Sequence, residues 1–184
     1  MKIECLRQTG GKMNREILAD FLRTLIAVAK YGRTTIYDGE IYYLPYTMMK
    51  YKVKETGEVY TFIASEVSDD VSVYKEEENI QLVLAKEDAR PEYVIGGKKN
   101  NSELLEEVGK KIQLNKKMRK TFQKYQFDLT EVKTVYLPEQ TFYGRGKKEY
   151  LFLVDHFLQK VDFKNLLPVE EQFAKNYLKE QNAR

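Results

Sequence analysis

The chain has 184 residues, of which 42% are hydrophobic and 32% are charged, and its formal net charge is +3. This balance excludes an intrinsically disordered chain and predicts a globular protein with one core, or one core with a subdomain. The only cysteine, Cys5, excludes an internal disulfide, and no stretch is apolar for long enough to form a transmembrane helix. We therefore expect a cytoplasmic protein without a transmembrane segment.

The N-terminal residues predict a short strand followed by an amphipathic helix. Lys2–Leu6 favours the strand, and Asn14 is a suitable N-cap for a helix that runs to about Lys30. Apolar residues recur every three or four positions along this helix, so we expect it to cover one face of a sheet. They are Ile17, Leu18, Phe21, Leu22, Leu25, Ile26 and Ala29.

The stretch from Thr34 to Tyr74 predicts an antiparallel meander. Asp38-Gly39 lies between two segments rich in Tyr, Ile and Thr, which favours a tight hairpin turn because such turns need a positive φ. A second loop contains Gly57. Further strands are predicted over Val71–Tyr74 and Ile80–Leu84.

The stretch Gly96–Asn101 predicts a linker between a segment 1–95 and a segment 102–184, and one continuous domain is the alternative. Beyond it, Ser102 is a candidate cap for a helix that reaches about Tyr125, either continuous or interrupted at Gly109 or Asn115. The remaining segments predict two strands and a last helix, over Val132–Leu137, Glu149–Asp155 and from Pro168 onward.

These elements predict an α+β fold. We expect an antiparallel sheet of five or more strands with the N-terminal helix packed on it, then a second helix-plus-hairpin unit and a C-terminal helix.

Tyr43-Leu44-Pro45 recurs as Tyr136-Leu137-Pro138. Each copy is followed by a strand, a glycine-containing loop and another strand, which indicates either an internal repeat or a chance recurrence of hairpin composition.

Few residues are suited to catalysis. His156 is the only histidine and its neighbour Asp155 is expected to point to the opposite face of a strand, so a surface role is favoured. Cys5 has no flanking basic residue except Arg7 and is expected to be inert. The pattern Glu131-Val132-Lys133 resembles half of a restriction-type nuclease motif. The matching aspartate of that motif should lie on the strand just before, but the preceding segment is predicted to be a helix. We expect no cofactor and no metal site.

A group of lysines on the predicted 102–125 helix is the strongest functional feature. At about 100° per residue, the five lysines fall within an arc of about 120°, opposite a stripe of apolar residues. The lysines are Lys110, Lys116, Lys117, Lys120 and Lys124, and the stripe is Leu104, Leu105, Val108, Ile112, Leu114, Met118 and Phe122. Such a face suits a phosphate backbone or an anionic membrane. Tyr125 and Phe127 could stack on single-stranded bases, and the alternative is that they belong to the core. For the lysines, the alternative is an ordinary solvated face, because lysines near a helix C-terminus also match the helix dipole.

Three functions remain open from the sequence. The first is a non-enzymatic intracellular binding or regulatory module that acts on protein partners, favoured by the scarcity of catalytic residues and by the many tyrosines expected at the surface. The second is a nucleic-acid-binding accessory protein that uses the basic face at 110–124. The third is a carboxylate-based hydrolase or nuclease. A homo-oligomer is compatible with each of them.

Overall fold

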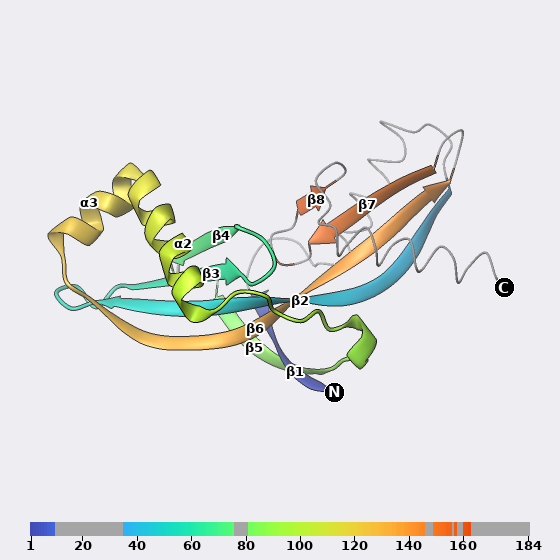
Figure 1. Cartoon of the computed structure of the whole chain (residues 1–184), viewed down its shortest axis with the longest axis horizontal. Helices are drawn as coiled ribbons and strands as arrows, with labels where there is room; N and C mark the ends of the chain where they lie inside the picture. The colour runs from blue at the N-terminus through green and yellow to red at the C-terminus, as the bar shows by residue number, and fades with distance from the viewer. Residues whose placement is uncertain (10–34, 76–80, 146–148, 156, 158–159, 163–184) are drawn as a thin grey trace. The chain divides into compact units, whose positions relative to one another are not determined.

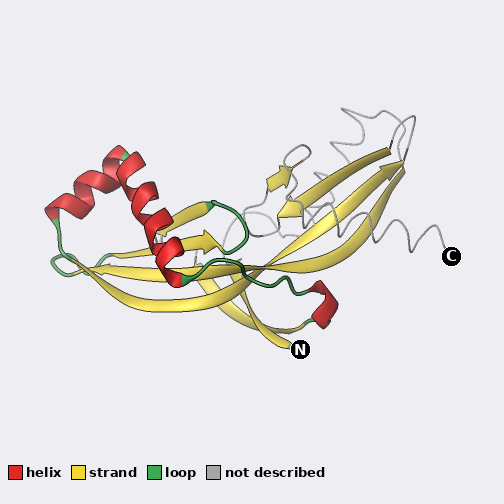
Figure 2. Cartoon of the chain, viewed as in Figure 1, coloured by secondary structure: helices red, strands yellow, loops and turns green. Residues whose placement is uncertain are grey.

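The computed structural model describes residues 1–9, 35–75, 81–145, 149–155, 157 and 160–162 (Figure 1). Within these ranges eight strands form one sheet with the hydrogen-bonded order β4-β3-β2-β6-β1-β5, and β7 pairs with β6 and with β8. The strands are β1 (Lys2–Thr9), β2 (Thr35–Val53), β3 (Val59–Ser65), β4 (Val71–Lys75), β5 (Gln81–Asp88), β6 (Phe127–Arg145), β7 (Glu149–Asp155) and β8 (Lys160–Asp162). The helices in this part of the chain are a short 3-10 helix at Pro91–Tyr93 and two α-helices, α2 (Asn101–Leu114) and α3 (Lys116–Lys124) (Figure 2).

This architecture confirms the mixture of helices with a largely antiparallel sheet. One pair departs from the prediction, because β1 pairs with β6 in parallel, with Cys5 opposite Tyr136. The described chain starts with a strand, and its α-helices are central in the sequence. The predicted helices at Asn14–Lys30 and from Pro168 lie outside the described residues, and no described helix is long and apolar enough to cross a membrane.

The predicted hairpin turn at Asp38-Gly39 is wrong. Both residues lie inside β2, which continues without a break from Thr35 to Val53. In the sheet β2 lies between β3 and β6, and β6 is an equally long strand that comes more than 70 residues later in the chain. The long-range pairing of β2 with β6 therefore outweighs the local turn preference of Asp-Gly.

The observed hairpin turn lies one segment later, between β2 and β3, at the second predicted loop. Gly57 has a φ of +74° and donates its N–H to the carbonyl of Val53 over 2.8 Å, while the Val53 N–H donates to the Glu58 carbonyl over 2.8 Å. A side chain at position 57 would meet no atom within 4 Å, so only the backbone conformation requires glycine there.

Gly57→Ala is therefore expected to lower the free energy of unfolding by about 1 kcal/mol, because a left-handed backbone is unfavourable for a residue with a Cβ. Urea denaturation followed by circular dichroism measures this loss. Gly57→Asn is the matched control, since asparagine tolerates a positive φ and is expected to lose less. Equal stability of the alanine variant and the unmodified protein would contradict the assigned turn.

Two parts of the chain repeat the same three-strand meander. β2 and β6 each have 19 residues, and β3 and β7 each have 7. The pairing of each long strand with its hairpin partner begins three residues after the tyrosine of Tyr-Leu-Pro, at Tyr46↔Ser65 and at Glu139↔Asp155. The third strands also match in register, with Ala64↔Val71 in one copy and Val154↔Val161 in the other. The sequence echo thus has a structural counterpart.

The chain divides into two compact units whose boundaries fall inside the two Tyr-Leu-Pro segments. The first unit comprises residues 1–10 and 44–136, and the second comprises residues 11–43 and 137–184. The stretch 96–101 lies inside the first unit. In the second unit the buried carboxylate of Glu139 accepts a hydrogen bond from the Tyr42 hydroxyl over 3.1 Å.

The helices of the first unit are capped by asparagines. The Asn100 side chain, rather than Ser102, caps α2, and Glu103 completes a capping box with it. The Asn115 side chain accepts hydrogen bonds from the N–H groups of Lys117 and Met118 and caps α3. The helix predicted to reach about Tyr125 is therefore interrupted at Asn115, one of the two positions considered from the sequence. Each cap satisfies backbone donors that the start of a helix would otherwise leave unpaired.

Both helices pack on the meander of the first unit (Figure 1). The buried cluster joins α2 and α3 to β2, β3 and β4 through Met49, Phe62, Ala64, Val71, Leu104, Val108 and Met118. Phe62 belongs to this cluster and contacts the rings of Tyr51 and Phe122 edge to face. The distance between ring centroids is 5.5 Å to Tyr51 and 6.0 Å to Phe122. This cluster determines which face of each helix remains at the surface.

Candidate functional site

The interruption at Asn115 places the five predicted lysines on two different helices. Lys110 belongs to α2, whereas Lys116, Lys117, Lys120 and Lys124 belong to α3. Lys110 is paired with Glu106 one turn earlier, at 2.7 Å, and this hydrogen bond raises the pKa of Lys110. It also lies towards the C-terminus of α2, where the helix dipole favours a cation. The presence of Lys110 is thus accounted for by its stabilising interactions within α2.

The remaining cations form a denser group than the sequence analysis identified. Arg119 belongs to it, so five of the nine residues of α3 are basic and none is acidic. We call Lys116, Lys117, Arg119, Lys120 and Lys124 the basic face of α3. The high density of basic residues in 116–124, five in nine positions, was the sequence signal that pointed to Arg119.

All five side chains of the basic face are exposed. Met118 is buried and Phe122 is half-buried, so these two residues define the side of α3 that faces the sheet. At about 100° per residue, the five cations fall within an arc of about 160° centred opposite Met118. The basic face therefore occupies the whole outer half of the helix.

Among the described residues, no carboxylate forms an ion pair with the basic face. The nearby Glu58 pairs with Lys75 at 2.7 Å, and Glu55 accepts hydrogen bonds from the Gln126 N–H at 3.2 Å. The pKa of Glu58 is lowered mainly by Lys75, with a smaller contribution from the charge of Lys117. Glu58 and Glu55 are thus bonded to other groups, and none of the five cations is paired with a described carboxylate.

The helix dipole does not explain the start of this face. Lys116 and Lys117 occupy the first turn of α3, where the positive end of the dipole disfavours cations, and no acidic residue accompanies them. The dipole explanation required one continuous helix with its lysines at the C-terminal end. The cap at Asn115 removes that explanation for these two residues.

The aromatic residues beside the face contact other side chains. The Phe127 ring is stacked on Phe122, with the centroids 3.7 Å apart and an interplanar angle of 4°. Both rings also contact Tyr60 edge to face. Tyr125 is half-buried and lies under the Lys124 ammonium group, which is 4.8 Å from the ring centroid. Phe127 therefore matches the alternative that the sequence left open, a packed residue.

The predicted apolar stripe is correct only in part. Leu104, Val108 and Met118 are buried, but Leu105 is exposed, and the side chain of Leu114 is 86% exposed immediately before the break. A continuous helix would have kept Leu114 in phase with the stripe. The break lets α3 turn onto the sheet and leaves Leu114 outside.

The other candidate residues do not form a site among the described residues. Glu131 pairs with Lys50 at 2.9 Å and Lys133 pairs with Glu4, so both members of the nuclease-like pattern take part in ion pairs within the sheet. The segment before them is α3, as predicted. Burial raises the pKa of Cys5 to about 12, and this thiol is fully buried. No group of three or more potential metal ligands occurs in the described ranges, and His156 lies outside them.

No protein-family model, no curated protein and no solved structure matches this chain. The basic face of α3 is therefore identified as the candidate site from its geometry and charge alone.

Proposed function

We propose that this protein is a non-enzymatic intracellular binding module that holds the phosphate backbone of a nucleic acid on the basic face of α3. The observation that carries the proposal is the set of five exposed cations on a nine-residue helix, unpaired with any described carboxylate. Lysine and arginine that neutralise phosphates release condensed counterions, and this release drives binding without base contacts.

The test is a salt titration of binding to a short labelled DNA duplex. Five phosphate contacts correspond to a slope of log affinity against log salt of about −4.5, and changing Lys116, Lys117, Lys120 and Lys124 to Gln should reduce the slope to about −1. The control variant changes four exposed lysines outside the helices, Lys2, Lys52, Lys86 and Lys98, to Gln. It has the same net charge but should keep a slope near that of the unmodified protein. Circular dichroism confirms that both variants remain folded.

Two results would contradict the proposal. One is the absence of binding to duplex and single-stranded nucleic acid at low salt. The other is an equal loss of slope in the α3 variant and the control variant, because binding would then depend on net charge rather than on the basic face.

A protein partner with an acidic surface is the second candidate, favoured by the exposed Leu114 next to the basic face. The tyrosines no longer support it, because every tyrosine whose side chain is described is buried or half-buried. Polyglutamate as a competitor separates the two functions. Displacement of the duplex by polyglutamate at an equal concentration of charge would favour the acidic protein, whereas a phosphate-specific face should release the duplex only at a large excess.

A further inference from the structure

The cations of the basic face are distributed on both flanks of α3. Relative to the direction opposite Met118, Arg119 lies about 80° to one side, and Lys117 and Lys124 lie about 60–80° to the other. Lys116 and Lys120 lie near the centre, within about 20° of that direction. A single phosphate strand lying along the helix would need only the central cations. Cations on both flanks instead match two rows of phosphate, one on each side of the helix.

Within the described residues, the outer half of α3 carries no aromatic side chain on which unstacked bases could stack. Proteins that hold single strands combine positive charge with exposed aromatic rings on which bases stack. Here Phe122 and Phe127 stack on each other, and both pack against Tyr60. The exposed half of α3 consists of the five cations together with Gln123. It is therefore suited to phosphates that a duplex already holds in place.

From these two features, and on the basis of the proposed function, we infer that the partner is B-form double-stranded DNA, with α3 docked in the major groove and its flanks against the two backbones. The B-form major groove is about 12 Å wide and admits a helix of about 10–12 Å diameter. The major groove of an RNA duplex is deep and narrow and does not admit one. Because four of the five cations are lysines, the contacts go mainly to phosphates and depend little on base sequence.

The test compares one mixed-sequence DNA duplex with its single strand and with the RNA duplex of the same sequence, by fluorescence anisotropy at equal salt. We expect the DNA duplex to bind at least about tenfold more tightly than either alternative, with the steeper salt slope that B-form DNA shows relative to a single strand. A second DNA duplex of unrelated sequence should bind with nearly the same affinity.

Two matched variants test the docking geometry. Each removes two charges from the same helix: Lys117→Gln with Arg119→Gln on the flanks, or Lys116→Gln with Lys120→Gln at the centre. The flank variant should reduce the salt slope for the DNA duplex by about 2, and the central variant by less than about 1. Circular dichroism verifies that helicity is equal in the two variants.

The outcomes separate this inference from the proposed function. Equal or tighter binding of the single strand or the RNA duplex, or a larger effect of the central variant, would overturn the duplex assignment while leaving a nucleic-acid-binding protein. Binding to none of the nucleic acids, or binding only to anionic phospholipid vesicles in a manner that Leu114→Gln abolishes, would overturn both.

Discussion

Replacement of Phe62 by alanine is expected to lower the free energy of unfolding by about 3–5 kcal/mol, the usual range for removing a buried aromatic side chain. Phe62 is fully buried in β3, where its backbone neighbours are Met49 in β2 and Val73 in β4. Its ring also contacts Phe122 of α3. The variant leaves a cavity between the sheet and both helices, so the sheet and the helices lose stability together.

Urea denaturation measures this change. Circular dichroism is the signal, because the chain contains no tryptophan whose fluorescence could be followed. Phe62→Leu, which keeps most of the volume, should lose clearly less than the alanine variant. Val132→Ala is the surface control, since Val132 is exposed and its truncation is expected to change stability by about 0.5 kcal/mol or less. A loss below about 1 kcal/mol in Phe62→Ala would show that this cluster does not hold the helices to the sheet.

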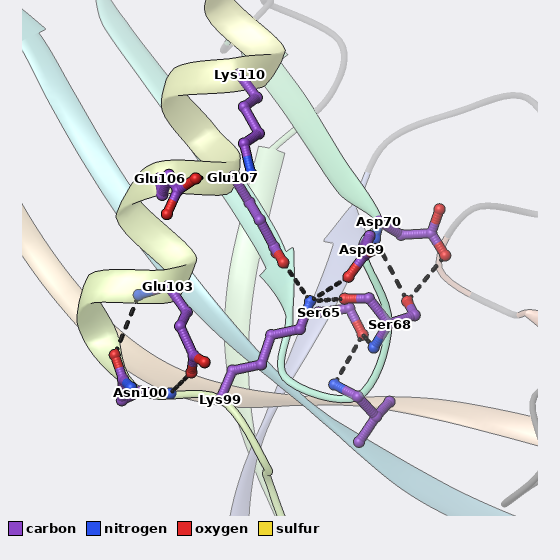
Figure 3. A network of polar contacts seen from close by, with 11 residues as sticks. Ser65, Ser68, Asp69, Asp70, Lys99, Asn100, Glu103, Glu106, Glu107 and Lys110 are labelled. Atoms are coloured by element: carbon purple, nitrogen blue, oxygen red, sulfur yellow. Dashed lines mark hydrogen bonds and ion pairs between the residues drawn. The ribbon is translucent and has the colours of Figure 1, made fainter.

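The second large effect concerns Lys99, which joins the loop between β3 and β4 to α2 (Figure 3). Its ammonium group lies 2.5 Å from a Glu107 carboxylate oxygen and 3.0 Å from Asp69, and it donates a hydrogen bond to the Ser68 carbonyl. The Lys99 and Glu107 side chains are each only 16% exposed. We expect Lys99→Met to lower the free energy of unfolding by about 2–3 kcal/mol, because it leaves the Glu107 charge largely buried without its partner.

A double-mutant cycle distinguishes loss of the pair from loss of packing. Lys99→Met combined with Glu107→Leu should recover most of the stability, since neither charge then remains buried. Asp69→Asn is the control, because Asp69 is 94% exposed and contributes little. If the double variant is as unstable as Lys99→Met alone, the carboxylate of Glu107 is not the source of the effect.

The same pair predicts how stability changes in alkali. Burial lowers the pKa of Lys99, but its hydrogen bonds and charge interactions with Glu107 and Asp69 outweigh burial, and the pKa is raised above its usual 10.5. A raised pKa in the folded state means that the stabilisation is complete below about pH 10.5 and is lost as the pH rises through the folded value. From neutral pH upward, the difference in stability between the unmodified protein and Lys99→Met should therefore stay constant to about pH 10.5 and shrink above it.

Local patterns in the sequence were sufficient for the short elements of the fold. Val71–Tyr74 and Glu149–Asp155 were predicted as strands and are strands, because alternating β-branched and aromatic residues suit a pleated surface wherever it lies. The Gly57 loop and the break at Asn115 could also be predicted from the sequence, because a positive φ and an N-cap are properties of single residues and their nearest neighbours.

Only the tertiary structure decided which side chains of the candidate site are free to bind. The break turns α3 so that Met118 and Phe122 enter the cluster around Phe62, and this packing leaves Leu114 exposed and brings Arg119 onto the basic face. Lys110 is held by Glu106, whereas Lys116 and Lys117 begin a new helix without an acidic neighbour.

The sequence by itself determined the periodicities, caps and turns, because these depend on interactions between residues close together in the chain. The course of β2 through Asp38-Gly39 and the parallel pair of β1 with β6 depend on partners many residues away. Such pairings are selected by the burial and backbone hydrogen bonding of the whole sheet, which no local pattern reports.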